Sequence, residues 1–323
     1  MNRLLAGLLI LTSAGTAWAA DTPLERIAFG SCNNQDLPQP LWVTIAAFNP
    51  QLWIWLGDNI YGDSEDMAVL SAKWDRQKSS PEYRKLTCPV TGTWDDHDFG
   101  VNDGGKDYLM KAASQRLFLK FLDVPADDPR WSQEGIYSAQ TFGPSGEQVA
   151  VILLDVRTFR DKPKTDGDIL GETQWAWLEK TLTDSRAQIH LIASGSQVLP
   201  TEHRFEKWSD YPKSRARILA LLDKYKTAAP VFLTGDRHHA EISLLNSPGP
   251  VHEITASSLT HSRKGNASEP NALRVGAVFT DNNFGTITID WKSRDASLAI
   301  RDRSGNPVLE KHIKLPDVSG SRP

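Results

Sequence analysis

Side chains able to bind a metal ion or to transfer a proton follow five short apolar segments of the chain. In chain order they are Gly30-Ser31-Cys32-Asn33, Gly57-Asp58-Asn59-Ile60-Tyr61, Asp95-Asp96-His97-Asp98, Asp155-Val156-Arg157 and Gly235-Asp236-Arg237-His238-His239. In open α/β sheets the ligand crevice lies just beyond the carboxyl ends of the strands, so we expect these segments to meet there. Carboxylates that converge in one place repel one another unless cations lie among them. The pattern therefore predicts a metal site.

Two Gly-Asp pairs contain the strongest candidates for metal ligands. Asp58 follows a glycine at the end of an apolar strand, and Tyr61, three residues further on, can face the same ion. The alternative is a carboxylate that caps a helix beside a packed tyrosine. A second pair, Gly235-Asp236, also follows an apolar strand, and His238 can reach the same site from an extended turn. This repetition favours the metal interpretation.

The acidic segment 95–98 and the segment around Arg157 supply candidates for proton transfer and phosphate binding. His97 lies among three acids, one of them the candidate ligand Asp96; they should raise its pKa and suit it to act as a general acid, whereas the alternative is a solvated acidic loop. Arg157 can hold a phosphate through two parallel hydrogen bonds or form an ion pair with Asp155. His239 is expected on the surface or behind the ligands. Further candidates for contact with substrate or a second metal are Asp95, Asn102 and Gln197.

The chain contains two cysteines, Cys32 and Cys88. Export to an oxidising compartment would permit a disulfide between them. Alternatively, Cys32 is a thiolate metal ligand at the first strand end, and Cys88 is a small buried apolar residue. The position of Cys32 favours the ligand interpretation.

Short apolar or β-branched runs alternate with helical patterns and must position these residues. Strands are expected at 26–30, 52–56, 90–94, 148–154, 189–194, 231–234, 251–255, 286–291 and 297–301, and helices at 40–48, 107–122, 172–183 and 213–226. Several strands are apolar throughout, which is typical of strands buried on both faces. The closing pair of strands predicts an antiparallel hairpin, so the sheets should be mixed. We expect one α/β domain over residues 20–316, followed by a polar tail over 317–323.

Composition and the N-terminus narrow the class of protein. The 323 residues are 40% hydrophobic and 24% charged with a net charge of −4, which excludes a disordered chain and provides no basic stripe for nucleic acid. Residues 1–19 carry Arg3, a short apolar run and an Ala-Trp-Ala cleavage pattern, as expected of a cleaved Sec-type signal peptide. The run is too short to span a bilayer, and no later segment suits an integral membrane span. The mature protein should therefore be periplasmic or extracellular.

In this order the five motifs resemble those of the alkaline phosphatase D family of metallophosphatases, over roughly residues 26–290. The resemblance implies a calcineurin-like metallophosphoesterase fold, in which two mixed β-sheets are flanked by helices in a four-layer sandwich. It also implies iron (Fe³⁺) together with calcium (Ca²⁺), although other divalent ions suit the carboxylates. Asn102 resembles an asparagine near the second metal or the phosphate. The implied metal ligands are Cys32, Asp58, Tyr61, Asp96, Asp236 and His238.

These observations predict an exported hydrolase that cleaves phosphomonoesters, phosphodiesters or both through a two-metal site with a metal-bound hydroxide. His97 would be the general acid and Arg157 a phosphate contact. The alternative is an exported carbohydrate-binding protein without catalysis, for which Trp74, Trp131 and Trp208 are free to line a cleft. An acyl esterase is disfavoured because no Gly-x-Ser-x-Gly motif is present.

Overall fold

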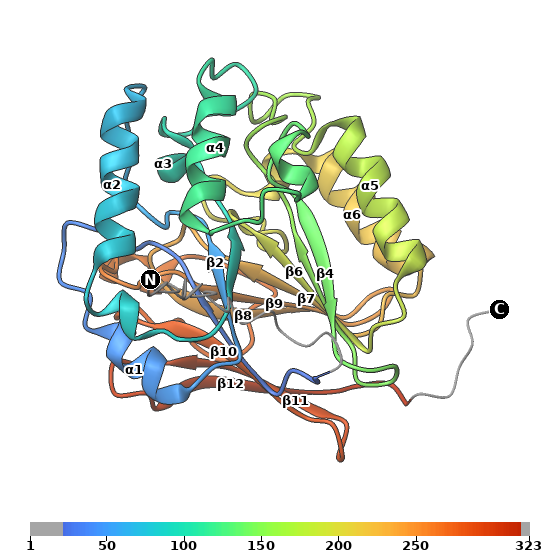
Figure 1. The fold of residues 1–323 in the computed structure, drawn as a ribbon. Helices are drawn as coiled ribbons and strands as arrows, with labels where there is room; N and C mark the ends of the chain where they lie inside the picture. The colour runs from blue at the N-terminus through green and yellow to red at the C-terminus, as the bar shows by residue number, and fades with distance from the viewer. Residues whose placement is uncertain (1–21, 318–323) are drawn as a thin grey trace, which may run out of the picture.

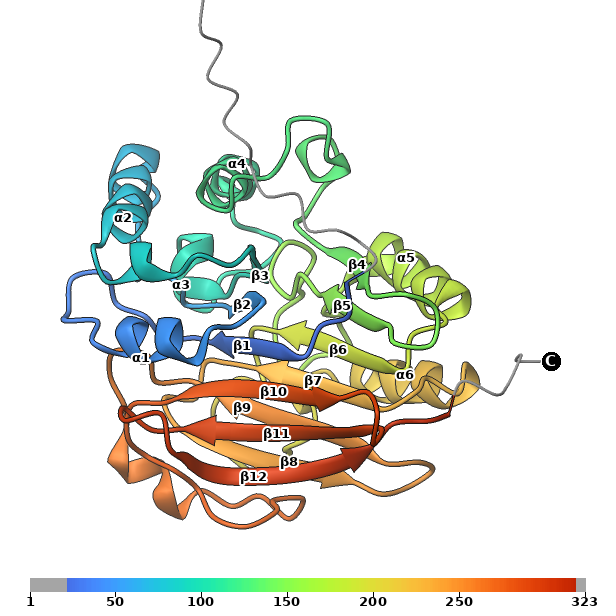
Figure 2. The ribbon, with the colours of Figure 1, turned by 60° about the horizontal axis from the view of Figure 1, so that its bottom comes forward.

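The computed structural model describes residues 22–317, so the signal peptide predicted at 1–19 and nearly all of the predicted tail lie outside the described residues. Two six-stranded sheets form the centre of the molecule (Figures 1 and 2). The first has the order β12 (Pro307–Lys314), β11 (Asp295–Arg301), β10 (Phe284–Asp290), β1 (Arg26–Gly30), β2 (Leu52–Leu56) and β3 (Val90–Thr93). The second has the order β4 (Ser138–Phe142), β5 (Val149–Leu153), β6 (Ile189–Ser194), β7 (Pro230–Thr234), β9 (Val251–Ala256) and β8 (Ala240–Leu245).

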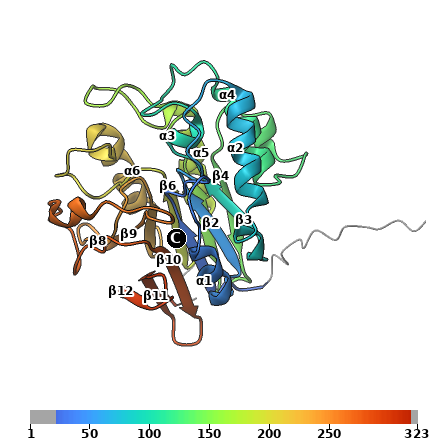
Figure 3. The same cartoon turned by 90° about the vertical axis from the view of Figure 1, so that its left-hand side faces the viewer.

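Both sheets are mixed, as expected. Strands β1 to β3 are parallel, whereas β10, β11 and β12 run antiparallel; β5, β6, β7 and β9 are parallel, and β4 and β8 are antiparallel edges. Four helices follow the parallel strands of the first sheet along the chain: α1 (Leu41–Phe48) after β1, α2 (Met67–Ser79) after β2, and α3 (Asp96–Phe99) and α4 (Lys111–Phe121) after β3. Helices α5 (Gly171–Asp184) and α6 (Pro212–Lys224) flank the second sheet, on the other side of the molecule (Figures 1 and 3).

Alternation along buried strands produces the four layers. In β2, Leu52, Ile54 and Leu56 enter the core between the two sheets, together with side chains of β6 and β7. Trp53 and Trp55 point to the opposite face and pack with residues of α1, α2 and α4. A third core joins α5 and α6 to the outer face of the second sheet. Because successive strand residues face opposite sides, a strand covered on both faces reads as an uninterrupted apolar run.

The predicted strands and helices all occur, with ends shifted by a few residues at most. Strands β4, β8 and β12 were not predicted. Polar or charged residues interrupt the apolar pattern of β4 and β12, and all three strands lie at sheet edges. Helix α2 was missed because it buries only Leu70, Trp74 and Gln77. Trp74 and Trp208 are 3% and 0% exposed, so the expectation that they could line a cleft is wrong.

The two sheets meet at the carboxyl ends of their parallel strands. Ser31, just after β1, forms a parallel bridge with Ser257, just after β9, and its hydroxyl donates to the carbonyl of Ala256 at 3.1 Å. Gly235 follows β7 at this junction. A Cβ atom there would lie 2.6 Å from the carbonyl oxygen of Leu56 and from Ser31 Oγ, so only glycine fits without displacing the backbone. Because these strand ends approach so closely, the loops that follow β1 and β2 meet the loops that follow β7 and β9 in one region.

Glu253 on β9 is a buried carboxylate that holds the loop after β6. It accepts hydrogen bonds from the backbone amides of Val198 at 3.2 Å and Leu199 at 2.6 Å and from the hydroxyl of Thr234 at 2.9 Å. Burial raises the pKa of Glu253 to about 7, although these hydrogen bonds favour its ionised form. The charge of Glu241 raises it further.

The effect of Glu253→Gln on stability should therefore depend on pH. An unfolded glutamate has a pKa of about 4.3, so Glu253 favours the folded state most below that pH and loses about 4 kcal/mol of this contribution as the pH rises from there through 7. The glutamine does not titrate, so the destabilisation caused by the substitution should shrink by that amount between acid and alkaline pH. Urea unfolding of the wild type and of Glu253→Gln, at one acid and one alkaline pH, measures this change in the free energy of unfolding. Exposed Glu25 provides the control, Glu25→Gln; an equal pH trend for both variants would contradict the prediction.

Candidate metal centre

Four candidate ligands adopt a backbone conformation that is rare for residues with a side chain. The φ angles of Cys32, Asp58, Asp236 and His238 are 56°, 49°, 67° and 55°. Residues other than glycine lose stability in this left-handed region, and such strain persists where the surrounding structure enforces it, often at functional sites. Each of these residues lies in the turn directly after a strand, at the junction of the two sheets. The strained turns aim their side chains into one region.

Two groups of ligand atoms converge in this region, and Asp58 belongs to both. The first contains Cys32, Asp58 and His238, and the second contains Asp58, Asp96 and His97; in each, the ligand atoms lie within 4.8 Å of one another. Cys32 Sγ lies 3.5 Å from Asp58 Oδ2. The hydroxyl of Tyr61 lies 3.5 Å from Nε2 of His238, which adds a phenol oxygen to the first group. The predicted combination of thiol, phenol, imidazole and carboxylate is thus present.

Several polar atoms of the centre are buried and lack partners. Within residues 22–317, Asp58 Oδ1, Asp95 Oδ2, Asp236 Oδ2 and His238 Nδ1 have no hydrogen bond. Burial, followed by the charges of Cys32 and Asp96, raises the pKa of Asp58 well above its usual range. Buried acceptors without donors are costly, and a cation satisfies several of them at once. The residues therefore fit metal ions, with sulfur and phenol on one side and carboxylates on the other.

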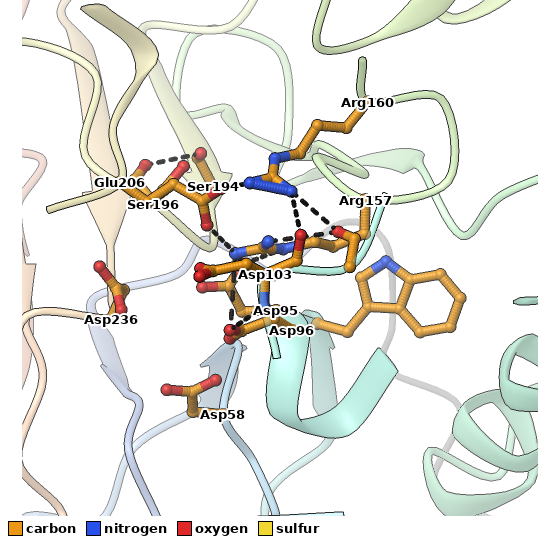
Figure 4. A network of polar contacts seen from close by, with 12 residues as sticks. Asp58, Asp95, Asp96, Asp103, Arg157, Arg160, Ser194, Ser196, Glu206 and Asp236 are labelled. Atoms are coloured by element: carbon orange, nitrogen blue, oxygen red, sulfur yellow. Dashed lines mark hydrogen bonds and ion pairs between the residues drawn. The ribbon is translucent and has the colours of Figure 1, made fainter. Parts of the chain in front are cut away.

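Asp236 lies near this centre but outside both compact groups. Its charge acts on Cys32 and Asp95, and its Oδ2 is 3.7 Å from Arg237 Nη1. Figure 4 shows the carboxylates of Asp58, Asp95, Asp96 and Asp236 around the same space.

Arg157 lies beside the carboxylates of Asp95 and Asp96 (Figure 4). Its side chain is 1% exposed, and it donates to Asp95 Oδ1 and to Glu206 Oε2, both at 2.5 Å. The alternative ion pair with Asp155 is not formed, because Asp155 accepts the backbone amide of Arg157 instead. Burial disfavours the charge of Asp96, but Arg157, His97 and the amide of Asp103 outweigh it and lower the pKa of that carboxyl. The geometry makes Arg157 a fixed counter-charge for Asp95 and Asp96.

His97 lies at the start of α3, with one nitrogen occupied. Its Nδ1 is 2.7 Å from Asp63 Oδ1, and its ring lies 4.3 Å from that of Tyr61. Burial opposes protonation, but Asp63 and the charge of Asp96 outweigh it and raise the pKa of His97 to about 9. The predicted rise in pKa is confirmed, and Asp63, which lies 34 residues away in the chain, is a partner that the sequence did not reveal.

The remaining sequence candidates lie around the centre or away from it. Asn102 is exposed, next to Asp103, whose amide donates to Asp96; within residues 22–317 its side chain makes no hydrogen bond. Gln197 is buried and donates to Glu241 and Thr255, in the interior of the second sheet. His239 is 1% exposed, so the expectation of a surface position is wrong, although it does lie behind the ligands.

Two residues of the segment after β9 belong to the centre but were not expected there. The ring of His261 lies 4.5 Å from that of His238 and 5.0 Å from that of Tyr61. Ser257 Oγ lies 3.0 Å from Cys32 Sγ and accepts the backbone amide of His238. His261 has no acid beside it in the sequence, so only the fold reveals its position.

Both cysteines are free thiols. The disulfide alternative for Cys32 and Cys88 is therefore wrong. Burial raises the pKa of both thiols, so a cation is needed to hold Cys32 as a thiolate.

Comparison with known proteins identifies the family. The sequence profile of the PhoD-like phosphatases matches residues 71–297. The chain belongs to this family. It is thus a metal-binding hydrolase of the phosphatase type, and the expectation of a phosphoesterase is confirmed at that level. No curated protein sequence matches the chain.

Solved structures share the fold of this PhoD-like phosphatase at low sequence identity. PhoD itself superposes with a TM-score of 0.73 at 18% identity, covering 94% of this chain and 72% of that one. GAP50, the anchor in the inner membrane complex of Plasmodium, gives 0.65 at 13% identity, with coverage of 92% and 90%. A dimetal phosphatase from Danio rerio gives 0.60 at 13%, covering 91% and 100%. The expected fold class is confirmed. Within residues 22–317, no helix has the length and apolar character needed to cross a bilayer.

Replacement of the shared carboxylate should have opposite effects with and without metal. In chelated protein, Asp58→Asn should raise the free energy of unfolding by about 1–3 kcal/mol, because it removes a buried charge among acids and because asparagine tolerates the left-handed turn. A metal ion at about 100 times its Kd should stabilise the wild type by about 3 kcal/mol and the variant much less. Thermal unfolding with and without added metal measures both effects. Exposed Asp75 supplies the control, Asp75→Asn; a full metal response in Asp58→Asn would contradict the assignment.

Proposed function

We propose that this PhoD-like phosphatase hydrolyses phosphoesters with two metal ions that share Asp58. The observation that carries the proposal is the membership of Asp58 in both ligand groups. Cys32, Tyr61 and His238 would hold the first ion, for which ferric iron suits the sulfur and the phenol. Asp96, with Asp236 near it, would hold the second, for which calcium or another hard divalent ion suits the oxygens.

The chain's own residues prepare this site for an anionic ester. Metal ions bound here would lower the pKa of a water molecule and neutralise the phosphoryl oxygens. Asp63 holds Nδ1 of His97, which leaves Nε2 to donate a proton to the departing alkoxide. Arg157 is bonded to Asp95 and Glu206. We therefore assign it the role of holding the acidic loop, and not that of a direct phosphate contact.

We also propose that the enzyme acts outside the cytoplasm, because residues 1–19 have the composition of a cleaved signal peptide. Phosphomonoesters and phosphodiesters are both candidate substrates. The carbohydrate-binding alternative is not favoured, because Trp74 and Trp208 are buried.

Metal content and activity should rise and fall together. Purified protein should contain metal by elemental analysis and should hydrolyse p-nitrophenyl phosphate or bis-p-nitrophenyl phosphate. Chelation should abolish this activity, and added iron and calcium should restore it. Asp58→Asn should lower kcat/KM by a factor of about 1,000 or more, whereas Asp75→Asn should not. Protein that binds no metal, or that stays inactive with every ion added, would refute the proposal.

Loss of the His97 imidazole should depend on the leaving group. His97→Ala should slow hydrolysis of an alkyl phosphate by about 100-fold or more, because an alkoxide needs a proton, and should slow p-nitrophenyl phosphate much less. Comparing kcat for the two esters separates this role from damage to the metal site, which would slow both equally. The control is His312→Ala, since the His312 side chain is exposed and bonds Asp295 on the far hairpin. An equal loss on both esters would rule out the acid role.

A further inference from the structure

Three arginines surround the ring of Phe205 next to the metal centre. The guanidinium carbons of Arg237, Arg204 and Arg263 lie 4.3, 4.9 and 5.9 Å from the ring centroid. Because all three guanidinium groups lie close to the same ring, any two of them are separated by roughly one Debye length or less. Their positive charges therefore repel one another. An anion bound among them would relieve this repulsion, and the group is here called the Phe205 arginine cluster.

Nearby carboxylates leave most of this charge unbalanced. Glu269 pairs with Arg237 at 2.5 Å, and Glu206 is occupied by Arg157 and Arg160. Arg204 and Arg263 are exposed and have no carboxylate within ion-pair distance in residues 22–317. Two positive charges therefore face solvent beside a site that is itself rich in acids.

Buried donors without partners also lie in the cluster. Arg237 is 1% exposed, and its Nε makes no hydrogen bond to any described residue. His203 is 5% exposed, and its ring centroid lies 6.5 Å from that of Phe205. Neither of its ring nitrogens has a partner in the described part of the chain. Buried polar groups in proteins are normally satisfied, so the groups left unpaired beside these arginines are suited to bind an anion.

The position of the cluster connects it to the reacting centre. The backbone amide of Arg263 donates to the carbonyl of His238 at 2.8 Å, and Arg237 Nη1 lies 3.7 Å from Asp236 Oδ2. The guanidinium of Arg237 thus lies between the Phe205 ring and a candidate metal ligand. Arg237 therefore connects the cluster to the candidate metal centre.

We propose that the Phe205 arginine cluster binds a second phosphate group of the substrate, so that the preferred substrates carry one phosphate at the metals and another at Arg204 and Arg263. This inference rests on the proposed phosphoesterase function and specifies its substrate class. Guanidinium groups bind phosphate oxygens through paired, charge-assisted hydrogen bonds, which makes them suited to this role.

Butanediol bisphosphate and butanediol monophosphate test the proposal, because both release the same kind of alkoxide. The wild type should have a kcat/KM for the bisphosphate about tenfold or more above that for the monophosphate, beyond the statistical advantage of two phosphates. The double variant Arg204→Gln, Arg263→Gln should lose this preference through a higher KM for the bisphosphate. Added salt should weaken the preference of the wild type as well.

A matched double variant, Arg84→Gln with Arg116→Gln, removes two exposed arginines elsewhere and should keep the preference. A wild type that does not prefer the bisphosphate, or a preference that survives in Arg204→Gln, Arg263→Gln, would overturn the proposal. If metal-loaded wild type hydrolyses neither ester, the proposed function itself fails. Calorimetric titration with the intact bisphosphate then tests the cluster directly: tighter binding than the monophosphate, lost in the cluster variant, sustains it, and equal binding refutes it.

Discussion

Repulsion among buried acids is the constraint on which the rest of this structure depends. Four aspartates are almost completely buried: Asp58, Asp95, Asp96 and Asp98. The charges of the other three raise the pKa of Asp58, and the charges of Asp95 and Asp96 raise the pKa of Asp98. Arg157, which is bonded to Asp95, supplies an internal positive charge beside them. Two backbone amides satisfy Asp98, at Asn59 and at Asp95 itself. Within residues 22–317, Asp58 Oδ1 has no hydrogen bond and Asp58 Oδ2 accepts one from the Cys32 thiol at 3.5 Å, so a cation would stabilise this carboxylate.

The backbone is shaped to hold those acids at close range. Gly57 adopts a φ of 92°, and a Cβ atom there would lie 2.5 Å from Asp95 Cβ, so glycine allows the end of β2 to touch the acidic loop. The positive φ angles of Asp58 and Asp236 impose a further cost, because residues with a Cβ disfavour that region. Folding tolerates this strain since the two sheets, with a continuous apolar core between them, fix both strand ends.

The sequence predicted the layers and the location of the site because both follow from local patterns. Alternation in β2 and the apolar runs of β6 and β7 depend on burial alone, and polar residues after such strands must collect at one edge. Contacts made by long-range packing were out of reach. The pairing of His97 with Asp63, the inward turn of Arg157 towards Glu206, and the approach of His261 to His238 each join segments whose separation in the chain carries no pattern.

Charge separation around Arg237 explains how acids and arginines coexist in one site. A guanidinium beside Asp236 would normally neutralise that carboxylate and compete with a metal for it. Glu269, however, binds Arg237 at 2.5 Å, whereas the distance from Arg237 to Asp236 is 3.7 Å. Asp236 Oδ2 is thereby left without a hydrogen bond to the rest of the described chain. Glu269 thus keeps Asp236 available to a cation, and Arg204 and Arg263, which have no such carboxylate, remain available to an anion. If metal ions are bound among the carboxylates, one phosphate of a substrate can lie at the metal ions and a second at Arg204 and Arg263.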